Sequence, residues 1–88
     1  MVQLGADVEQ LDTLSQKFNT VAGEIQQMMT ALGGQIDGAW WQGGDADRFR
    51  SEWQGSYRPQ LQNVCEALQN TAQTVKAQSD QQRQASGG

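Results

Sequence analysis

Apolar residues recur along the first half of the chain with a period of seven. The three apolar rows are Leu4, Leu11, Phe18, Ile25 and Leu32; Val8, Ser15, Ala22, Met29 and Ile36; and Leu14, Val21 and Met28. This spacing places all three rows on one broad face of an α-helix. The pattern therefore predicts an amphipathic helix from about residue 7 to about residue 38. The small residues Ser15 and Ala22 would let a neighbouring helix approach closely.

The second half of the chain carries another helical stripe. Its members step by three or four residues and are Ala46, Phe49, Trp53, Tyr57, Leu61, Val64, Leu68, Ala72 and Val75. They predict a second helix from about residue 45 to about residue 78, with Asp45 as its N-cap. Pro59 lacks an N–H and crowds the carbonyl four residues back, which predicts a kink near Gly55–Pro59 with the stripe in phase on both sides. Residues 79–88 hold no apolar side chain larger than alanine and are predicted to be a flexible polar tail.

These elements predict an all-α fold in which residues 1–80 form one antiparallel hairpin. The connection at residues 39–44 is too short for any other arrangement of two long helices. Each apolar stripe is wider than one neighbouring helix can cover, so a second hairpin is expected to complete a four-helix bundle. The predicted partner interface consists of Leu4, Val8, Leu11, Leu14, Phe18, Val21, Ala22, Ile25, Met28, Met29, Leu32, Phe49, Trp53, Tyr57, Leu61, Val64, Leu68 and Val75.

Composition narrows the range of functions. A net charge of −4 disfavours nucleic acid and anionic membranes as main partners, and the acidic, glutamine-rich outer face disfavours stable membrane insertion. The chain has one cysteine and no histidine, so we expect no metal site, no cofactor and no enzymatic activity. Cys65 is interpreted as an inert thiol at the margin of the stripe. Arg48, Arg50 and Glu52 are interpreted as part of a solvated face.

The N-terminal segment has neither a basic region nor an apolar run, which is unlike a secretory signal peptide. No stretch approaches the ~18 consecutive apolar residues of a membrane span. The sequence therefore predicts a cytosolic protein, or one that leaves the cell by a route that does not use the general signal.

The centre of the chain carries a recognisable motif. Trp41-x-Gly43, Asp45-Ala46, Phe49 and Trp53 lie between the two predicted helices. This arrangement resembles the WXG100 family, the ESAT-6-like helical hairpins exported by type VII (ESX) secretion systems, and its extended form is similar to actinobacterial members. The resemblance implies a non-enzymatic export substrate that is cytoplasmic before export and is secreted without a cleaved signal peptide. It also implies pairing with another WXG100 protein, and recognition of the pair by the secretion ATPase with Trp41 and Gly43 as motif residues.

One element of that resemblance is missing. Actinobacterial members carry a Y-x-x-x-D/E export signal after the second helix, on one partner of a pair. Here the fourth residue after Tyr57 is Leu61, and the fourth residue before Asp80 is Lys76. This favours a heterodimer whose other chain supplies the signal, although a homodimer, a shortened chain or signal-independent export would also account for its absence. Outside the family resemblance, the alternatives are a cytosolic helical adaptor or structural protein and, with less support, a membrane-active effector.

Overall fold

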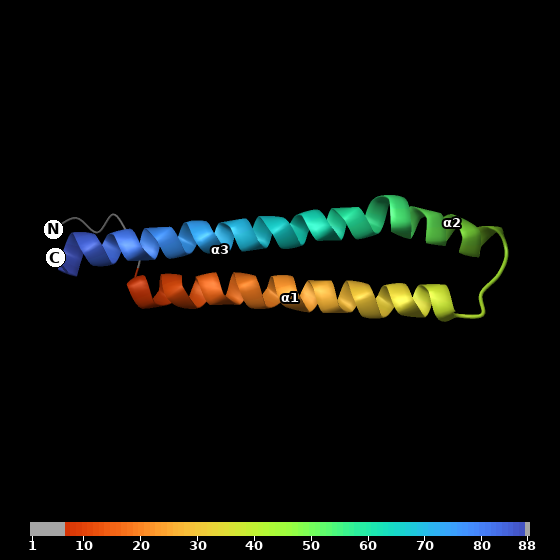
Figure 1. Ribbon diagram of the computed structural model, residues 1–88, viewed down its shortest axis with the longest axis horizontal. Helices are drawn as coiled ribbons and strands as arrows, with labels where there is room; N and C mark the ends of the chain where they lie inside the picture. Colours follow the sequence, from red (N-terminus) through yellow and green to blue (C-terminus); the bar gives the residue numbers. More distant parts are fainter. Residues whose placement is uncertain (1–6, 88) are drawn as a thin grey trace.

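The computed structural model describes residues 7–87 of the chain. Helix α1 spans Val8–Gly38, and after a short turn the chain continues through α2 (Gly44–Glu52), one π-helical turn (Trp53–Tyr57) and α3 (Arg58–Gly87). Figure 1 shows α1 as one arm of a hairpin and α2, the π-helical turn and α3 as the other arm, which runs back beside it. The described residues contain helices and no strand. The predicted all-α antiparallel hairpin is confirmed.

The hairpin is a rod with little interior. It measures 65 × 17 × 14 Å and has a radius of gyration of 19.4 Å, whereas a compact domain of this length would have one of about 12 Å. Each helix therefore has one neighbour only, and most of each helical surface lies outside the contact between the two arms.

Helix α1 starts with a side-chain cap and ends without a left-handed residue. The Asp7 carboxylate accepts a hydrogen bond from the Gln10 amide at 3.1 Å, which satisfies one of the free N–H groups of the first turn. At the other end, Ala39 is extended, with φ −73° and ψ 142°, so no left-handed residue caps the last carbonyls.

The two arms meet along a row of buried residues that we call the inner seam. Its members are Ser15, Ala22, Met29, Ile36, Ala46, Trp53, Cys65, Ala72 and Ser79. Several of them are small, and polar contacts cross the seam: the Ser15 hydroxyl donates to the Ala72 carbonyl at 2.8 Å, and the Cys65 thiol lies 3.5 Å from the Ala22 carbonyl oxygen. The helices therefore approach closely, as the small residues Ser15 and Ala22 predicted.

The inner seam changes phase at the π-helical turn. Trp53 lies seven residues after Ala46, and Ala72 lies seven after Cys65, but Cys65 lies twelve residues after Trp53. Counted from Trp53, a regular alternation of steps of three and four would bring residue 64 to the seam position that Cys65 occupies. A π-helical turn holds one extra residue, here closed by the hydrogen bond from the Arg58 N–H to the Trp53 carbonyl. The prediction of a stripe with constant phase is wrong by one residue.

This shift decides which side chain near the middle of α3 is buried. The predicted stripe ran through Val64 and left Cys65 at its margin. In the structure Cys65 is completely buried and Val64 is 46% exposed. The wider turn directly precedes Pro59, which has no N–H with which to continue the helical pattern, and it stands where the sequence predicted a kink.

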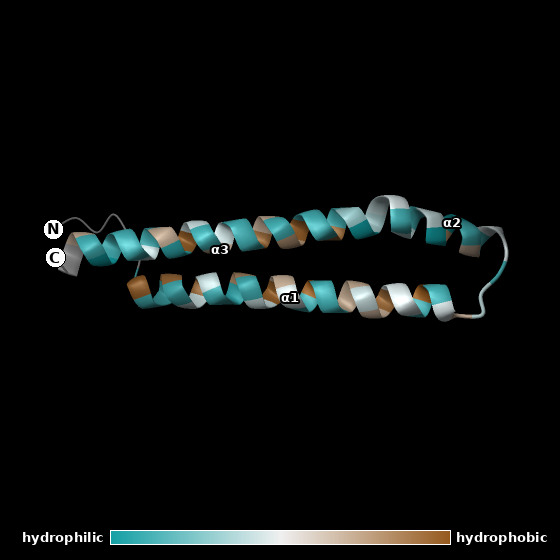
Figure 2. Cartoon of the chain, viewed as in Figure 1, coloured by the Kyte–Doolittle hydropathy of each residue, from teal (hydrophilic) through white to brown (hydrophobic). Residues whose placement is uncertain are grey.

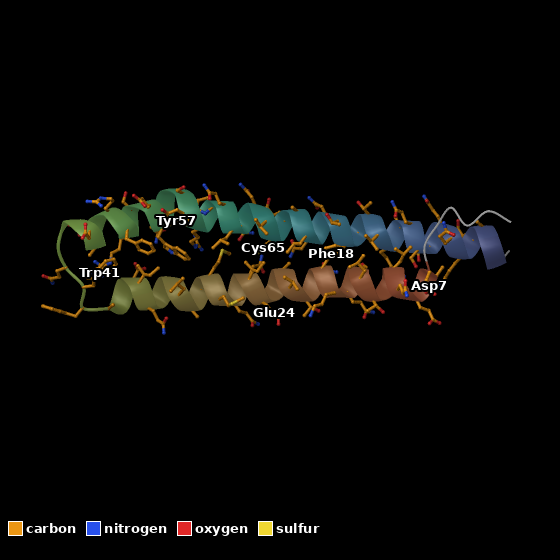
Figure 3. All side chains as sticks on the ribbon, turned by 180° about the vertical axis from the view of Figure 1, so that it is seen from behind. Asp7, Phe18, Glu24, Trp41, Tyr57 and Cys65 are labelled. Carbon is orange, nitrogen blue, oxygen red and sulfur yellow. The ribbon has the colours of Figure 1, made fainter. Side chains whose placement is uncertain are left out.

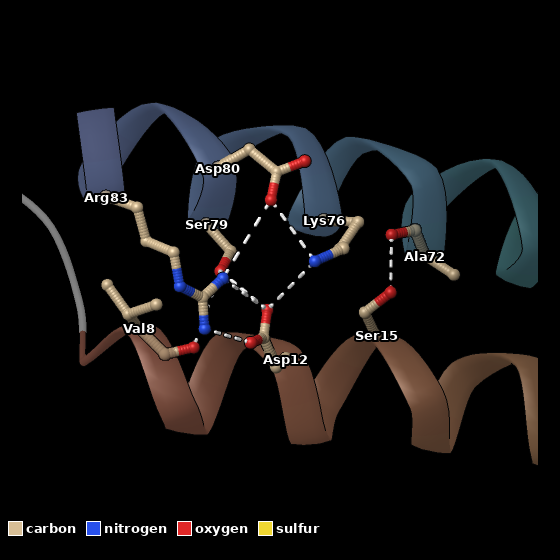
Figure 4. Close-up of polar contacts among 8 residues, drawn as sticks. All are labelled: Val8, Asp12, Ser15, Ala72, Lys76, Ser79, Asp80 and Arg83. Atoms are coloured by element: carbon tan, nitrogen blue, oxygen red, sulfur yellow. Dashed lines mark hydrogen bonds and ion pairs between the residues drawn. The ribbon is translucent and has the colours of Figure 1, made fainter. Parts of the chain in front are cut away.

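Helix α3 continues to Gly87, beyond the predicted end near residue 78. Figure 4 shows side chains from this segment joined to Asp12 of α1. The Ser79 hydroxyl donates to Asp12 Oδ1 at 2.6 Å, Arg83 pairs with both oxygens of the same carboxylate, and Lys76 Nζ lies 3.7 Å from Oδ1. These cross-arm contacts hold a segment without large apolar side chains as helix, so the predicted helix end is corrected.

Helix α2 begins one residue earlier than predicted. Gly43 is its N-cap and has φ +116°, a left-handed conformation that favours glycine. Asp45 therefore lies in the first turn and not at the cap, where its carboxylate is 3.4 Å from Arg48 Nη2.

Candidate interaction site

A second apolar row flanks the inner seam on each arm. Residues four before or three after a seam position lie about 40–60° around the helix from it, and residues one before it lie about 100° around in the same direction. Both helices are right-handed but run antiparallel, so their residue numbers advance around the two axes in opposite senses when both are viewed from one end. The flanking rows of the two arms therefore lie on the same side of the hairpin. We call this side the pairing face; it consists of Leu11, Leu14, Phe18, Val21, Ile25, Met28, Leu32, Phe49, Tyr57, Leu61, Val64, Leu68 and Val75. Figure 2 shows apolar residues recurring along the length of both arms.

The pairing face is incompletely covered within one chain. Ile25, Leu61 and Leu68 pack against the cluster formed by Ala22, Met29 and Cys65. Farther from the seam, Met28 is 61% exposed. The other pairing-face residues with large exposed side chains are Leu14, Leu32, Tyr57 and Val64. The hairpin thus leaves several large apolar side chains of this face only partly covered by its own two arms.

The structure divides the predicted partner-interface residues into three groups. Ala22, Met29 and Trp53 are buried in the inner seam, and are therefore not on the free surface where they were predicted. Val8 is half-buried at the open end of the hairpin. Leu4 lies outside the described residues, and the remaining predicted residues form the pairing face.

Aromatic side chains gather where the chain turns. The Trp41 and Phe49 rings have centroids 6.0 Å apart, and Phe49 is likewise 6.0 Å from Tyr57. Figure 3 shows Trp41 at the turn and Tyr57 on the arm formed by α2, the π-helical turn and α3. Trp41 keeps 42% of its surface exposed and Trp40 keeps 88%. The turn therefore presents two adjacent indoles, and Trp41 is the one that packs on a neighbouring ring.

Arg50 is a site residue that the sequence interpretation missed. It was assigned to a solvated face, but it is half-buried. Its guanidinium donates to the carbonyls of Ile36, Ala39 and Trp41, and its central carbon lies 5.7 Å from the Trp41 ring centroid. The absence of a basic residue in the last turn of α1 is the signal that could have pointed to a cation from another segment.

Two carboxylates shape the electrostatics of the described residues. Hydrogen bonds from Arg83 and Ser79 hold the pKa of Asp12 well below its usual range, against the smaller opposing effect of desolvation. Near the turn, the Tyr57 hydroxyl donates to Glu52 Oε2 at 2.8 Å, and this bond to a carboxylate raises the pKa of Tyr57. Both interactions fix side chains in place.

Within residues 7–87, no group of three or more His, Cys, Asp or Glu side chains is arranged to hold a metal ion. Of the helices in that same part of the chain, none combines the length and the apolar character that crossing a bilayer requires.

A helical hairpin whose turn carries Trp-x-Gly defines a small class of proteins, and comparison of the sequence with family models agrees. The model described as "Proteins of 100 residues with WXG" matches residues 3–85. The chain belongs to the WXG100 family. Members of this family are small type VII secretion substrates without enzymatic activity, and they generally form dimers. No curated protein and no solved structure matches the chain.

Proposed function

We propose that this protein is an ESAT-6-like substrate of a type VII (ESX) secretion system that is exported as one half of a four-helix bundle. The observation that carries the proposal is the pairing face, a continuous set of large, partly exposed apolar side chains along both arms. A second hairpin of similar length has the shape and chemistry to cover it. Family membership supports the same reading.

The favoured partner is a different WXG100 protein. Within residues 1–88 the Y-x-x-x-D/E signal is absent, since Leu61 follows Tyr57 by four residues and Lys76 precedes Asp80 by four. In a heterodimer the second chain supplies this signal. The turn with Trp41 and Gly43 then lies at the end of the bundle, where it contributes with the partner's signal to the surface that the secretion ATPase recognises.

Export from a host with a type VII system tests this function. The chain is expressed with and without its WXG100 partner, and the culture medium and the cells are assayed for both proteins. We expect the chain in the medium only when both are present. Export after deletion of the partner would contradict the heterodimer. Retention in the cytosol with partner and secretion system both present would favour a cytosolic adaptor instead.

A further inference from the structure

The end of α1 leaves carbonyl groups that the chain must satisfy in another way. The last four carbonyls of a helix have no partner within it. Here the Ala39 N–H reaches the Gln35 carbonyl at 3.0 Å, but no basic residue stands in the last turn and Ala39 does not adopt the left-handed conformation. The carbonyls of Ile36 and Trp41 remain available to a donor from elsewhere, and the Ala39 carbonyl, which accepts from the Trp41 backbone N–H, can accept a second hydrogen bond.

Arg50 of α2 supplies that donor to all three carbonyls. Nε and Nη2 each lie 3.1 Å from the Ile36 oxygen. Nη2 also lies 3.2 Å from the Ala39 oxygen, and Nη1 lies 2.8 Å from the Trp41 oxygen. A guanidinium carries five N–H donors in a rigid planar fork, whereas a lysine ammonium offers three donors around a single atom. Lysine can therefore replace the charge of Arg50 but not its simultaneous contact with three carbonyls.

The same guanidinium also contacts the motif tryptophan. It stands 5.7 Å from the Trp41 ring centroid, close enough for a cation–π interaction, while Phe49 contacts the ring at 6.0 Å. The Trp41 N–H is bonded to the Ala39 carbonyl at 3.0 Å. The turn backbone and the side chain of Trp41 are thus both tied to α2, although nearly half of the side chain stays open to solvent.

We propose that Arg50 is a positioning residue that holds the turn in one conformation and so presents Trp41 to the recognising protein. This inference rests on the proposed role of the turn in export. A loop that is ordered before binding loses less conformational entropy when it is bound. Arg50 acts through Trp41 and the turn backbone, so its loss weakens recognition while the inner seam and the pairing face keep the hairpin folded and paired.

Arg50→Gln tests the proposal, with Arg50→Lys as the charge-preserving variant. Arg48→Gln is the matched control, since Arg48 lies on the same helix but is exposed and pairs with the exposed Asp45. In the purified, paired protein we expect the Trp41 amide to exchange with solvent at least about tenfold faster in Arg50→Gln, and Arg50→Lys not to restore protection. The melting temperature should fall by less than about 5 °C, and Arg48→Gln should leave the exchange unchanged.

A mutant cycle with Trp41→Ala separates positioning from a general structural role. Each single variant should reduce export several-fold with the pairing affinity unchanged, and the double variant should export no less than Trp41→Ala, because both changes disable one unit. Unchanged exchange in Arg50→Gln, full rescue by lysine, or additive export losses would each overturn the proposal. If the wild-type chain is not exported at all, the proposed function fails, and the exchange data still decide whether Arg50 orders the turn.

Discussion

The inner seam and the pairing face run side by side along the same two helices but are built from side chains of different size. The seam is rich in small residues, among them Ala22, Cys65 and Ala72, which are fully or almost fully buried. The pairing face carries Leu, Met, Phe, Val and Tyr, and its outer members such as Met28 remain largely exposed. Close contact within the chain and apolar area for a partner are thus assigned to different rows of residues.

This division predicts that a single hairpin of this kind is a poor independent fold. Small seam residues bring the helices together, but they remove little apolar area from water. Full burial of one large aliphatic or aromatic side chain contributes roughly 1.5–3 kcal/mol. Leu14, Met28, Leu32, Tyr57 and Val64 keep 41–61% of their surface exposed, so part of that gain remains for a second hairpin. The seam therefore sets the geometry of the hairpin, and we expect the exposed part of the pairing face to add stabilisation when a second hairpin covers it.

The largest effect on pairing is expected from a charge placed on the pairing face. Met28→Asp would put a carboxylate into the centre of the proposed interface, where it would find no partner. We expect the dissociation constant of the pair to rise at least about a hundredfold, measured by sedimentation equilibrium. Gln27→Asp is the control, since it adds the same charge at an exposed position of the same helix outside the pairing face. Equal effects of the two changes would disprove the assignment of the face.

A smaller effect is expected from enlarging the inner seam. Ala22 is completely buried between the arms, so Ala22→Leu should force the helices apart and lower the free energy of unfolding by about 1–3 kcal/mol. Ala77→Leu makes the same change at an exposed position of α3. This control should alter the free energy of unfolding by no more than about 0.5 kcal/mol. Urea denaturation of the paired protein measures both. A seam that accepts leucine at residue 22 without loss would show that it is not closely packed.

The one-residue phase shift can be tested by enlarging side chains of α3 in the paired protein. Cys65 is completely buried between the arms, so Cys65→Leu should lower the free energy of unfolding by about 1–3 kcal/mol. Ala67→Leu, at an exposed position of the same helix, should change the free energy of unfolding by no more than about 0.5 kcal/mol. Urea denaturation measures both, and a Cys65→Leu variant as stable as the wild type would place Cys65 at the margin of the stripe, as the constant-phase prediction required.

The smallest expected effect concerns the open end of the hairpin. Since Arg83 and Ser79 depress the pKa of Asp12 in the folded state, its carboxylate adds stability that is fully present above its unfolded pKa of about 4. That stability is lost as the pH falls below this value. Asp12→Asn should therefore be less stable at pH 7 and lose less stability between pH 5 and pH 2 than the wild type. Urea denaturation across this range, with the exposed Asp37→Asn as control, measures the difference.

The regular parts of the fold could be predicted from the sequence, and the long-range polar contacts could not. The heptad rows of α1 define a helix and its buried face because each seam position repeats every seven residues. The phase shift after Trp53 was not predicted, because two sets of residues in this half of the chain are spaced at helical intervals. The stripe through Tyr57 and Val64 fits steps of three and four as well as the observed inner seam does. The seven-residue spacing of Cys65, Ala72 and Ser79 was the available signal, but Cys65 was assigned to the margin of the stripe and Ser79 to the flexible tail.

The Arg50 contacts and the Asp12 network were missed for a different reason. Both join residues far apart in the sequence: Arg50 reaches back 14 residues to Ile36, and Ser79 reaches back 67 to Asp12. Charged residues on an amphipathic helix are usually solvated, and only the packing of the two arms decides which of them meet a carbonyl or a carboxylate. The turn motif itself was recognised from Trp41 and Gly43, whereas the residue that holds it was not.

The mass of the folded protein in solution decides whether the hairpin needs a second hairpin in order to fold. Sedimentation equilibrium at micromolar concentration, with circular dichroism on the same sample, should find helical protein only in assemblies of two hairpins, either two copies of the 9.7 kDa chain or one copy with its partner. The chain kept apart from any partner hairpin should be poorly folded. A stable, fully helical 9.7 kDa monomer whose melting temperature is unaffected by Met28→Asp would contradict the account.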